Sequence, residues 1–460
     1  MLSFKKPSIQ KKNSILAAAL LLFFCFLLTA LIPPLQSPDE RDHLKRAYFL
    51  SQGQIFLTAQ PHKLSGGPLD SGLLEYLNFS EKYPFRPDIK VTEQDIVRLK
   101  TIPWSHKSVY AEAPGTGYYF PVLYAPQAIG LTVGRWLGLS VDRSYMLARL
   151  SAIAAIGILL FASFLLTTPN PLVLALLILP MSLFQEAACS LDGVSTAMTI
   201  LAISCFLRIT QDRDKAPLRL LILFAVSVTL VTSCRQHALP LLGLIFLSAA
   251  FTHRKASLIA GTIASLFTVS WTILSLKTTV FKLPLPATSA SERAVHYVLH
   301  PWSFFKILFH TLGLHMVQVD YLTTFLGRLG WLDTPLPGHA YGILTAALIV
   351  LAVLSCPFTA FRNNWQARLS LGCAALVSFL LIFFAMLITW SDDAPTTIGG
   401  VQGRYFLIPA LLFAYALNGN EKQETSTLCY CASLTILGGL FLFSSHEMIG
   451  VLLQRYYITP

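Results

Sequence analysis

Two carboxylates, a histidine and an arginine occur at helical spacing shortly after the first apolar stretch of the chain. In the segment PPLQSPDERDHLKRAY (33–48), Asp39 and Glu40 directly follow a proline that can start a helix. On such a helix Asp39, His43 and Arg46 stand at positions i, i+4 and i+7, so they share one face. A carboxylate near an imidazole and a guanidinium suits general-base catalysis beside an anionic group. The alternative is a capped helix start exposed to solvent.

A second polar segment, GVQGRYF (400–406), lies immediately before an apolar stretch. Its two glycines allow the backbone to bend closely around a ligand. Arg404, flanked by Gln402 and Tyr405, can bind a phosphate at the level of the lipid headgroups through its forked guanidinium. The alternative is an interfacial Arg-Tyr anchor that fixes the depth of a helix in the membrane.

The composition predicts a membrane protein. Of 460 residues, 54% are hydrophobic and only 12% are charged, whereas a soluble domain carries about 25% charged residues. Apolar runs of roughly 16 to 22 residues recur from Ile15 to Phe443, long enough to cross a hydrocarbon core of about 30 Å as helices. They lack β-barrel alternation, so the predicted fold class is an all-α polytopic membrane protein. The net charge of +11 comes from scattered basic residues, which argues against a nucleic-acid partner.

Cysteine and histidine spacing gives no metal signature. The eight cysteines lie mostly inside or at the ends of apolar runs, without a CxxC pair, and are expected to pack as small apolar residues. His296 and His300, at i and i+4, leave a divalent metal ion as an alternative to ordinary surface histidines. We therefore predict no certain cofactor and assign no metal ligand.

Lysine and arginine predict the orientation of the chain. Lys5, Lys6, Lys11 and Lys12 precede the first apolar run and place the N-terminus in the cytoplasm. That run is too long for the apolar core of a signal peptide, so it should stay as the first membrane helix. The apolar pattern predicts about eleven spans, near 14–32, 145–167, 171–187, 193–210, 217–232, 237–252, 256–276, 339–359, 369–389, 404–418 and 427–445.

One further apolar stretch, Tyr118–Leu139, has two interpretations. As a span it would place the basic loop 208–219 outside, and as a juxtamembrane or re-entrant segment it places that loop inside. We favour the second, because Pro121, Pro126 and three glycines weaken a regular span. The same choice places other basic residues inside: His253-Arg254-Lys255, Arg362, Arg368 and Lys422.

This topology gives one transmembrane domain (1–460) with two long extracytoplasmic regions. The first, 33–144, follows helix 1 and should contain juxtamembrane helices. The second, 277–338, lies between helices 7 and 8. It should contain an amphipathic interfacial helix, because apolar residues recur there at helical spacing: Trp302, Phe305, Phe309 and Leu312.

Unusual polar residues then collect at the outer ends of the helices. A charge at mid-bilayer costs about 2.5 to 3.5 kcal/mol, so charges gather at helix ends even without a function. The inner ends, however, hold mainly lysine and arginine, and this sorting favours a shared outer site. GWLDTPLP (330–337), SLDG (190–193) and the RQH segment at 235–237 add weaker candidates. The candidate site residues are Asp39, Glu40, His43, Arg46, Asp192, Arg235, Asp333, Gln402, Arg404 and Tyr405.

The same segments occur together, in the same order, in one family. PPLQSPDERDHLKRAY, Pro121–Gly130, SLDG, GWLDTPLP and GVQGRYFLIP make nearly the whole chain resemble the bacterial membrane-protein family named domain of unknown function 2142. That family is grouped with the GT-C glycosyltransferases, which have many spans and an acidic pair in a large first outer loop. The resemblance implies a GT-C-like fold in the bacterial inner (cytoplasmic) membrane, with the active face outside.

The resemblance also implies roles for residues. Asp39 and Glu40 correspond to the acidic pair, and Asp39 would be the general base that takes a proton from the acceptor hydroxyl. Arg404, with Arg46 or Arg235, would hold the phosphate of a polyprenyl-phosphate-linked sugar.

Asp192 would correspond to the second carboxylate of GT-C enzymes. The implied function is inverting transfer of the sugar to a cell-envelope glycan or a lipid-linked acceptor, in contact with membrane lipids. A glycan polymerase or ligase with similar donors stays open. A non-enzymatic transporter or assembly factor also stays open, although a transporter should show inverted repeats and charges along the bilayer interior.

Overall fold

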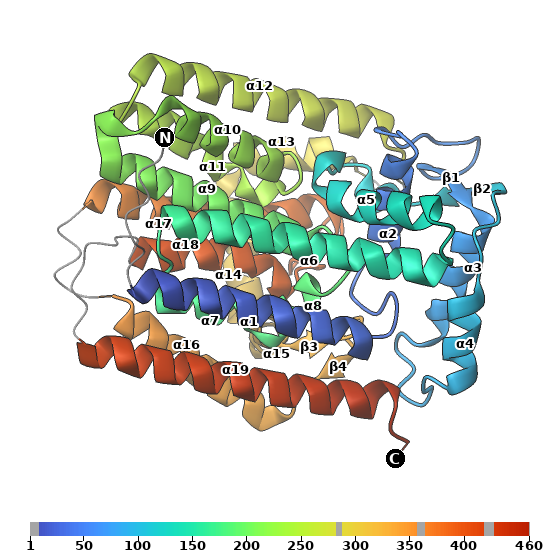
Figure 1. The fold of residues 1–460 in the computed structure, drawn as a ribbon. Coiled ribbons are helices and arrows are strands. Elements are labelled where there is room, and N and C mark those ends of the chain that lie inside the picture. Colours follow the sequence, from blue (N-terminus) through green and yellow to red (C-terminus); the bar gives the residue numbers. More distant parts are fainter. Residues whose placement is uncertain (1–8, 282–287, 357–363, 418–426, 460) are drawn as a thin grey trace.

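The computed structural model describes residues 9–281, 288–356, 364–417 and 427–459. Within these ranges, six helices are long and apolar enough to cross a membrane, and the longest of them run roughly parallel (Figure 1). They are α1 (Ile9–Leu31), α6 (Val141–Leu166), α9 (Asp192–Asp212), α12 (Arg254–Thr278), α17 (Trp365–Thr389) and α19 (Thr427–Tyr456). Each exceeds the roughly 20 residues that a membrane crossing requires. The prediction of a polytopic helical membrane protein is confirmed at this level.

Shorter apolar helices fill the space between the long ones. They are α10 (Leu218–Thr232), α11 (Pro240–Leu247), α16 (Gly338–Leu354) and α18 (Leu407–Leu417). The segment predicted as one span at 171–187 is instead two helices, α7 (Pro171–Leu177) and α8 (Pro180–Glu186). The break has a local cause, because a residue before proline avoids the helical conformation, and Leu179 has extended backbone angles.

Residues 33–140 form a cap over one end of the helices, at the right in Figure 1. The cap contains α2 (Glu40–Ser51), β1 (Gly66–Asp70), α3 (Ser71–Phe79), α4 (Glu93–Thr101), β2 (Ser108–Glu112) and α5 (Ala125–Trp136). Strands β1 and β2 pair antiparallel, with Gly66 opposite Glu112. A second short pair, β3 (Arg328–Leu329) and β4 (Thr334–Pro335), lies between α15 (His315–Leu326) and α16. The all-α prediction therefore missed two small sheets.

Backbone hydrogen bonds tie the cap to the ends of three distant helices. Phe120 N donates to Ser233 O just after α10, over 3.1 Å. Ser65 N donates to Val280 O just after α12 (2.9 Å), and Val91 N donates to Tyr456 O at the end of α19 (2.8 Å). The cap and this end of the helical bundle therefore form one structural unit.

Helix α5 occupies the stretch for which the sequence allowed two interpretations. Its 12 residues span about 18 Å, less than the hydrocarbon core of about 30 Å. The helix packs closely on α6, since a Cβ at Gly130 would lie 2.6 Å from Ala148 Cα. The juxtamembrane interpretation of this stretch stays a prediction.

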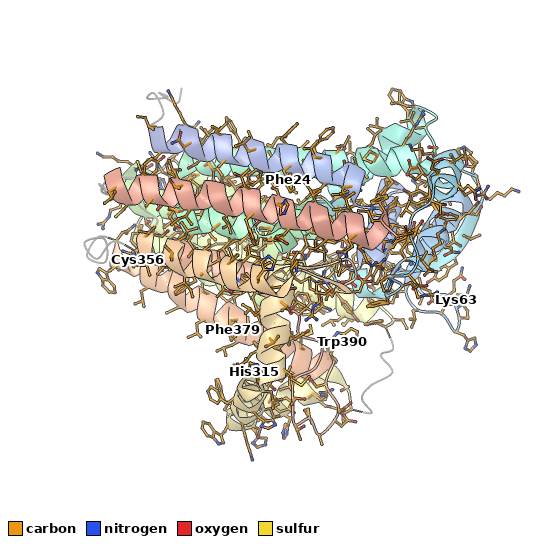
Figure 2. The ribbon with its side chains drawn as sticks, turned by 90° about the horizontal axis from the view of Figure 1, so that it is seen from below. Phe24, Lys63, His315, Cys356, Phe379 and Trp390 are labelled. Carbon is orange, nitrogen blue, oxygen red and sulfur yellow. The ribbon has the colours of Figure 1, made fainter. Side chains whose placement is uncertain are left out.

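Three helices extend sideways from the bundle: α13 (Ala290–Leu299), α14 (Pro301–Gly313) and α15, whose first residue is labelled in Figure 2. On α14, Phe304 and Leu308 are buried, whereas Trp302 and Phe309 are 76% and 62% exposed. A helix is thus present where the sequence predicted one, with apolar side chains both buried and exposed, and its interfacial position in a second outer loop stays a prediction. The orientation prediction also used Lys5, Lys6, Arg362 and Lys422, which lie outside the described residues.

Candidate active site

Asp39 stands at the junction between α1 and α2 with its carboxylate available. The helix begins at Glu40 rather than at the preceding proline, and Asp39 is its N-cap residue in a left-handed conformation (φ 60°). Aspartate tolerates this conformation better than most residues. Its side chain makes no capping hydrogen bond. The carboxylate can therefore interact with groups outside its own helix.

The partner of Asp39 is Arg404, a residue 365 positions later. Arg404 Nη2 donates to Asp39 Oδ2 over 2.5 Å. The Arg404 side chain is 3% exposed, whereas that of Asp39 is 58% exposed. The two motifs that the sequence singled out thus meet in one ion pair, between the start of α2 and the start of α18. Such a charge-assisted bond from a buried guanidinium is among the stronger hydrogen bonds.

Asp192 and Arg235 extend this pair into a network of alternating charges. Arg404 Nη1 lies 3.8 Å from Asp192 Oδ2, and Arg235 forms an ion pair with the other oxygen of Asp192. Arg235 Nε also donates to Ser195 Oγ (3.3 Å). Asp192 is the first residue of α9, where the helix dipole favours a negative charge. Two carboxylates and two guanidiniums therefore balance one another.

The residues around Arg404 fix its position. Gln402 Oε1 accepts a hydrogen bond from Arg404 Nε (2.6 Å), and the Tyr405 ring centroid lies 5.2 Å from the guanidinium carbon. Gly403 N donates to Thr324 Oγ1 on α15, and a Cβ at Gly403 would lie 2.0 Å from Tyr321 O. The prediction that both glycines make room for a ligand is thus wrong for Gly403, because α15 occupies that space.

His43 joins the site through two tyrosines. Its Nδ1 lies 2.6 Å from the Tyr124 hydroxyl, and its ring stacks near Tyr119 at a centroid distance of 6.1 Å. Burial lowers the pKa of His43, and the positive charges of Arg235 and Arg404 lower it further, against the opposing effect of Asp192 and Asp39. The imidazole is therefore neutral at pH 7.

The network also sets the protonation state of Asp39. Removal from water acts to raise its pKa, but the positive charge of Arg404 and the hydrogen bond that Arg404 donates outweigh that effect. The pKa of Asp39 consequently lies below its ordinary value. The carboxylate is ionised at neutral pH, and it stays a weak base while it is paired with Arg404.

Glu40 is differently placed from Asp39. It is 1% exposed, and its Oε1 accepts from the Tyr145 hydroxyl (2.7 Å) and from Cys189 N (2.6 Å). Its Oε2 accepts from Ser37 N (3.2 Å). These bonds connect α2 with α6 and with the loop before α9, so the geometry favours Asp39 over Glu40 as the reactive carboxylate.

We expect Glu40→Gln to destabilise the fold. An amide nitrogen cannot accept a hydrogen bond, so at least one buried donor loses its partner, at a cost of about 1 to 3 kcal/mol. Thermal unfolding of the purified protein in detergent should show a lower Tm than the wild type. Glu75→Gln, a partly exposed carboxylate paired with Arg98, is the control and should leave Tm nearly unchanged. An equal Tm for Glu40→Gln and wild type would contradict this structural role.

Two predicted binding residues lie apart from the network. Arg46 is fully buried and donates to the carbonyl oxygens of Gln54 and Ile55, so it fixes the loop after α2. The Arg46 guanidinium is thus bonded to backbone oxygens of this loop, although it lies near Tyr124, the hydrogen-bond partner of His43. Asp333 accepts from Phe85 N (2.7 Å) and pairs with Arg455 near the end of α19 (3.1 Å).

A cavity of about 900 Å³ borders Asp39 on the cap. Its size is within the range of small-molecule sites. Trp331 of the β3–β4 loop and Phe85 of the cap line it together with Asp39. Trp331 Nε1 donates to Leu35 O (3.0 Å), which fixes the indole. Asp39 thus belongs both to the cavity lining and to the ion-pair network.

Four of the nine non-glycine residues with positive φ in the described part of the chain lie at or beside this cavity. Leu35, Asp39 and Phe85 line it and have φ values of 63°, 60° and 59°, and Leu332, next to Trp331, has φ 64°. A left-handed conformation costs a non-glycine residue about 1 to 2 kcal/mol. Such residues persist where the surroundings hold them, and they cluster at functional sites. Here Asp333 holds Phe85 by accepting its backbone N–H.

Several residues that had no predicted role complete the site. Tyr124 and Gln127 belong to the PVLYAPQAIG segment, whose prolines were used for the topology and whose sequence contributed to the family resemblance. Gln127 Nε2 donates to Ser190 O (2.7 Å) and so positions the loop that carries Asp192. A polar glutamine within an otherwise apolar stretch was the signal that could have identified it. No feature of the sequence distinguished Tyr119 as a residue of the site.

The described residues contain no group of three or more His, Cys, Asp or Glu side chains that could hold a metal ion. His296 on α13 and His300, the residue after that helix, have ring centroids 4.9 Å apart, with the ring planes tilted by 57°. Neither histidine takes part in the ion-pair network around Arg404.

The fold and this site define a helical membrane protein with a charged, partly buried cluster at one end of its helices. The family profile described as predicted membrane protein (DUF2142) matches residues 22–413, and the chain belongs to this family. The resemblance inferred from the motifs is confirmed to that extent. No curated protein and no solved structure matches the chain.

Proposed function

We propose that this protein is an inverting membrane glycosyltransferase of the GT-C type, which moves a sugar from a polyprenyl-phosphate donor to an acceptor in the cell envelope. The observation that carries the proposal is the ion pair between Asp39 and Arg404 at the edge of a large cavity. It provides a carboxylate for the acceptor and a guanidinium for the donor phosphate, side by side.

The proposed reaction uses these two groups on opposite sides of the anomeric carbon. The acceptor hydroxyl oxygen attacks this carbon while its proton passes to Asp39. The bond from the anomeric carbon to the phosphate oxygen breaks, and polyprenyl phosphate leaves with the electron pair. Arg404 neutralises the charge that develops on the phosphate, in a setting where little water screens it. Attack opposite the leaving group inverts the anomeric centre.

The ion pair between Asp39 and Arg404 in the unliganded protein implies that the donor binds before Asp39 acts as a base. A donor phosphate competes with Asp39 for Arg404, so donor binding separates the pair. Because Arg404 holds the pKa of Asp39 low, separation raises that pKa and makes the carboxylate a better base. The base is thus activated only when a donor is present. Arg235 and Asp192 keep Arg404 in position during the exchange.

The proposal places the capped end of the helices outside the cytoplasm, in the inner membrane of a bacterium. It also takes the four shorter apolar helices as spans completed by their adjoining residues and counts α7 and α8 together as one crossing. With the six long helices this gives about eleven crossings. Polyprenyl lipids would then present their phosphates at the level of Arg404.

Cysteine labelling tests this orientation. In a background without native cysteines, Lys63→Cys at the capped end should react with a membrane-impermeant maleimide added to intact cells (Figure 2). Lys215→Cys, an exposed residue between α9 and α10, should react only after the membrane is permeabilised. Labelling of Lys215→Cys in intact cells would reverse the orientation.

The activity is tested by mass analysis of cell-surface glycans with and without the gene. We expect one sugar substituent to be lost when the gene is deleted and restored by the wild-type copy. Loss of long glycan chains with intact short ones would indicate a polymerase or ligase instead. Unchanged glycans together with accumulation of lipid-linked intermediates would indicate a transporter.

A further inference from the structure

The cavity beside Asp39 differs in chemistry from the Arg404 network. Its lining has four carboxylates and two basic side chains: Asp39, Asp42, Glu81, Glu112, Arg41 and Lys45. Both bases are already paired, because Lys45 Nζ lies 2.8 Å from Asp42 Oδ1 and Arg41 forms an ion pair with Glu81. Because Arg404 balances Asp39, Glu112 is the carboxylate that makes the lining net acidic. Such a lining suits a neutral ligand better than a phosphate.

Aromatic side chains provide the second element of the cavity. The Phe85 ring is 65% exposed, and Trp331 is half-buried with its indole N–H bonded to the Leu35 carbonyl. The Tyr110 hydroxyl donates to the carbonyls of Thr58 and Leu64, so this ring is also fixed. Fixed aromatic faces attract the slightly positive C–H groups of a sugar ring, and they lose little entropy on binding.

The carboxylates of the cavity can accept hydrogen bonds from the hydroxyl groups of a sugar. The Asp42 side chain is 40% exposed, and Asp39 and Glu112 are also accessible. Ionised carboxylates accept strong hydrogen bonds from hydroxyl groups. The left-handed backbone at Leu35, Asp39 and Phe85 shows that the fold holds this wall in an unfavourable conformation, which is typical of a binding site.

We infer that this cavity binds the acceptor as a neutral carbohydrate, stacked on Trp331 and Phe85 with a hydroxyl directed to Asp39. The inference rests on the proposed function, and it identifies the acceptor as a polyhydroxylated glycan end rather than the hydroxyl of a lipid. The donor and the acceptor then approach Asp39 from different sides, the donor from Arg404 and the acceptor from the cap.

The test is binding of the full-length protein in lipid nanodiscs to an array of soluble oligosaccharides, both neutral and acidic. We expect the wild type to be retained by a subset of neutral glycans. Trp331→Ala should reduce retention about tenfold, whereas Trp331→Phe should keep most of it because the aromatic face is preserved. Trp136→Ala, on a side chain that is 85% exposed and outside the cavity lining, is the matched control and should bind normally.

A second variant tests the cavity independently in case Trp331→Ala does not fold. Phe85→Asn removes the ring and retains a residue that tolerates positive φ, so the wall should keep its shape while retention falls. Absence of retention by the wild type would overturn the inference, as would normal retention of both Trp331→Ala and Phe85→Asn.

A second experiment measures whether nanodiscs that carry the protein are captured by immobilised polyprenyl phosphate. Arg404→Ala should abolish this capture, and Trp331→Ala should not change it. Capture that Arg404→Ala abolishes, without retention by any glycan, would leave the proposed function standing and reject the acceptor cavity. Glycan retention that depends on Trp331, without capture by polyprenyl phosphate, would support the cavity and reject the donor assignment.

Discussion

Replacing Asp39 with asparagine is expected to reduce sugar transfer by about 10²- to 10⁴-fold, the usual loss when a general base is removed. Asparagine is nearly isosteric and can still accept a hydrogen bond from Arg404, so the site should keep its shape. It cannot take the proton of the acceptor hydroxyl. The measurement is incorporation of labelled sugar in membranes of a deletion strain supplied with each variant, which retain the natural donor and acceptor.

The control for this variant is Asp88→Asn, a carboxylate on the cap that is 63% exposed and paired with Arg86. Its transfer rate should equal that of the wild type. Abundance in the membrane should be the same for all three proteins, because the Asp39 side chain is 58% exposed and makes no capping bond. Near-normal transfer by Asp39→Asn would remove the general base from the mechanism.

Arg404→Ala is expected to reduce transfer by about 10²- to 10³-fold, the scale of losing one group that stabilises developing negative charge. It should also shift the dependence of rate on donor concentration to higher values, because the phosphate loses its main partner. Arg404→Lys keeps the charge but loses the bonds that the guanidinium makes to Gln402 and Asp39, so it should recover only part of the rate.

Arg98→Ala is the matched control, since this arginine is 60% exposed in a surface ion pair with Glu75. It should leave transfer unchanged. An Arg404→Ala protein with a lower maximal rate but an unchanged dependence on donor would indicate that Arg404 acts only through Asp39. The phosphate-binding role would then be wrong, even though the ion pair would stay important.

The sequence alone was sufficient to predict the membrane class, because apolar runs and scarce charges are direct consequences of the lipid environment. It also selected Asp39 and Arg404, since a carboxylate at helical spacing from a histidine and an arginine at the level of the lipid headgroups suit base catalysis and phosphate binding. The structure brings the two into contact across 365 positions. Asp192 and Arg235, the weaker candidates, join the same network.

Other features depended on tertiary contacts that no local pattern records. Asp333 and Arg46 have the residue types of a binding site, but their partners are Arg455, Phe85 and the carbonyls of a folded-back loop. The cap sheets were missed because β1 is the five-residue segment GGPLD, which lacks the alternating apolar pattern of a strand. By contrast, the division of 171–187 into two helices has a local cause, because Pro180 lies inside the apolar run.

The long separation between Asp39 and Arg404 has a consequence for biosynthesis. At about 5 to 20 residues per second, the ribosome adds Arg404 roughly 20 to 70 s after Asp39. Asp192 and Arg235 can neutralise each other during that interval, being separated by only 43 positions. The nascent chain therefore carries an incomplete centre until its last helices insert, and a truncated product would lack the guanidinium that holds the donor.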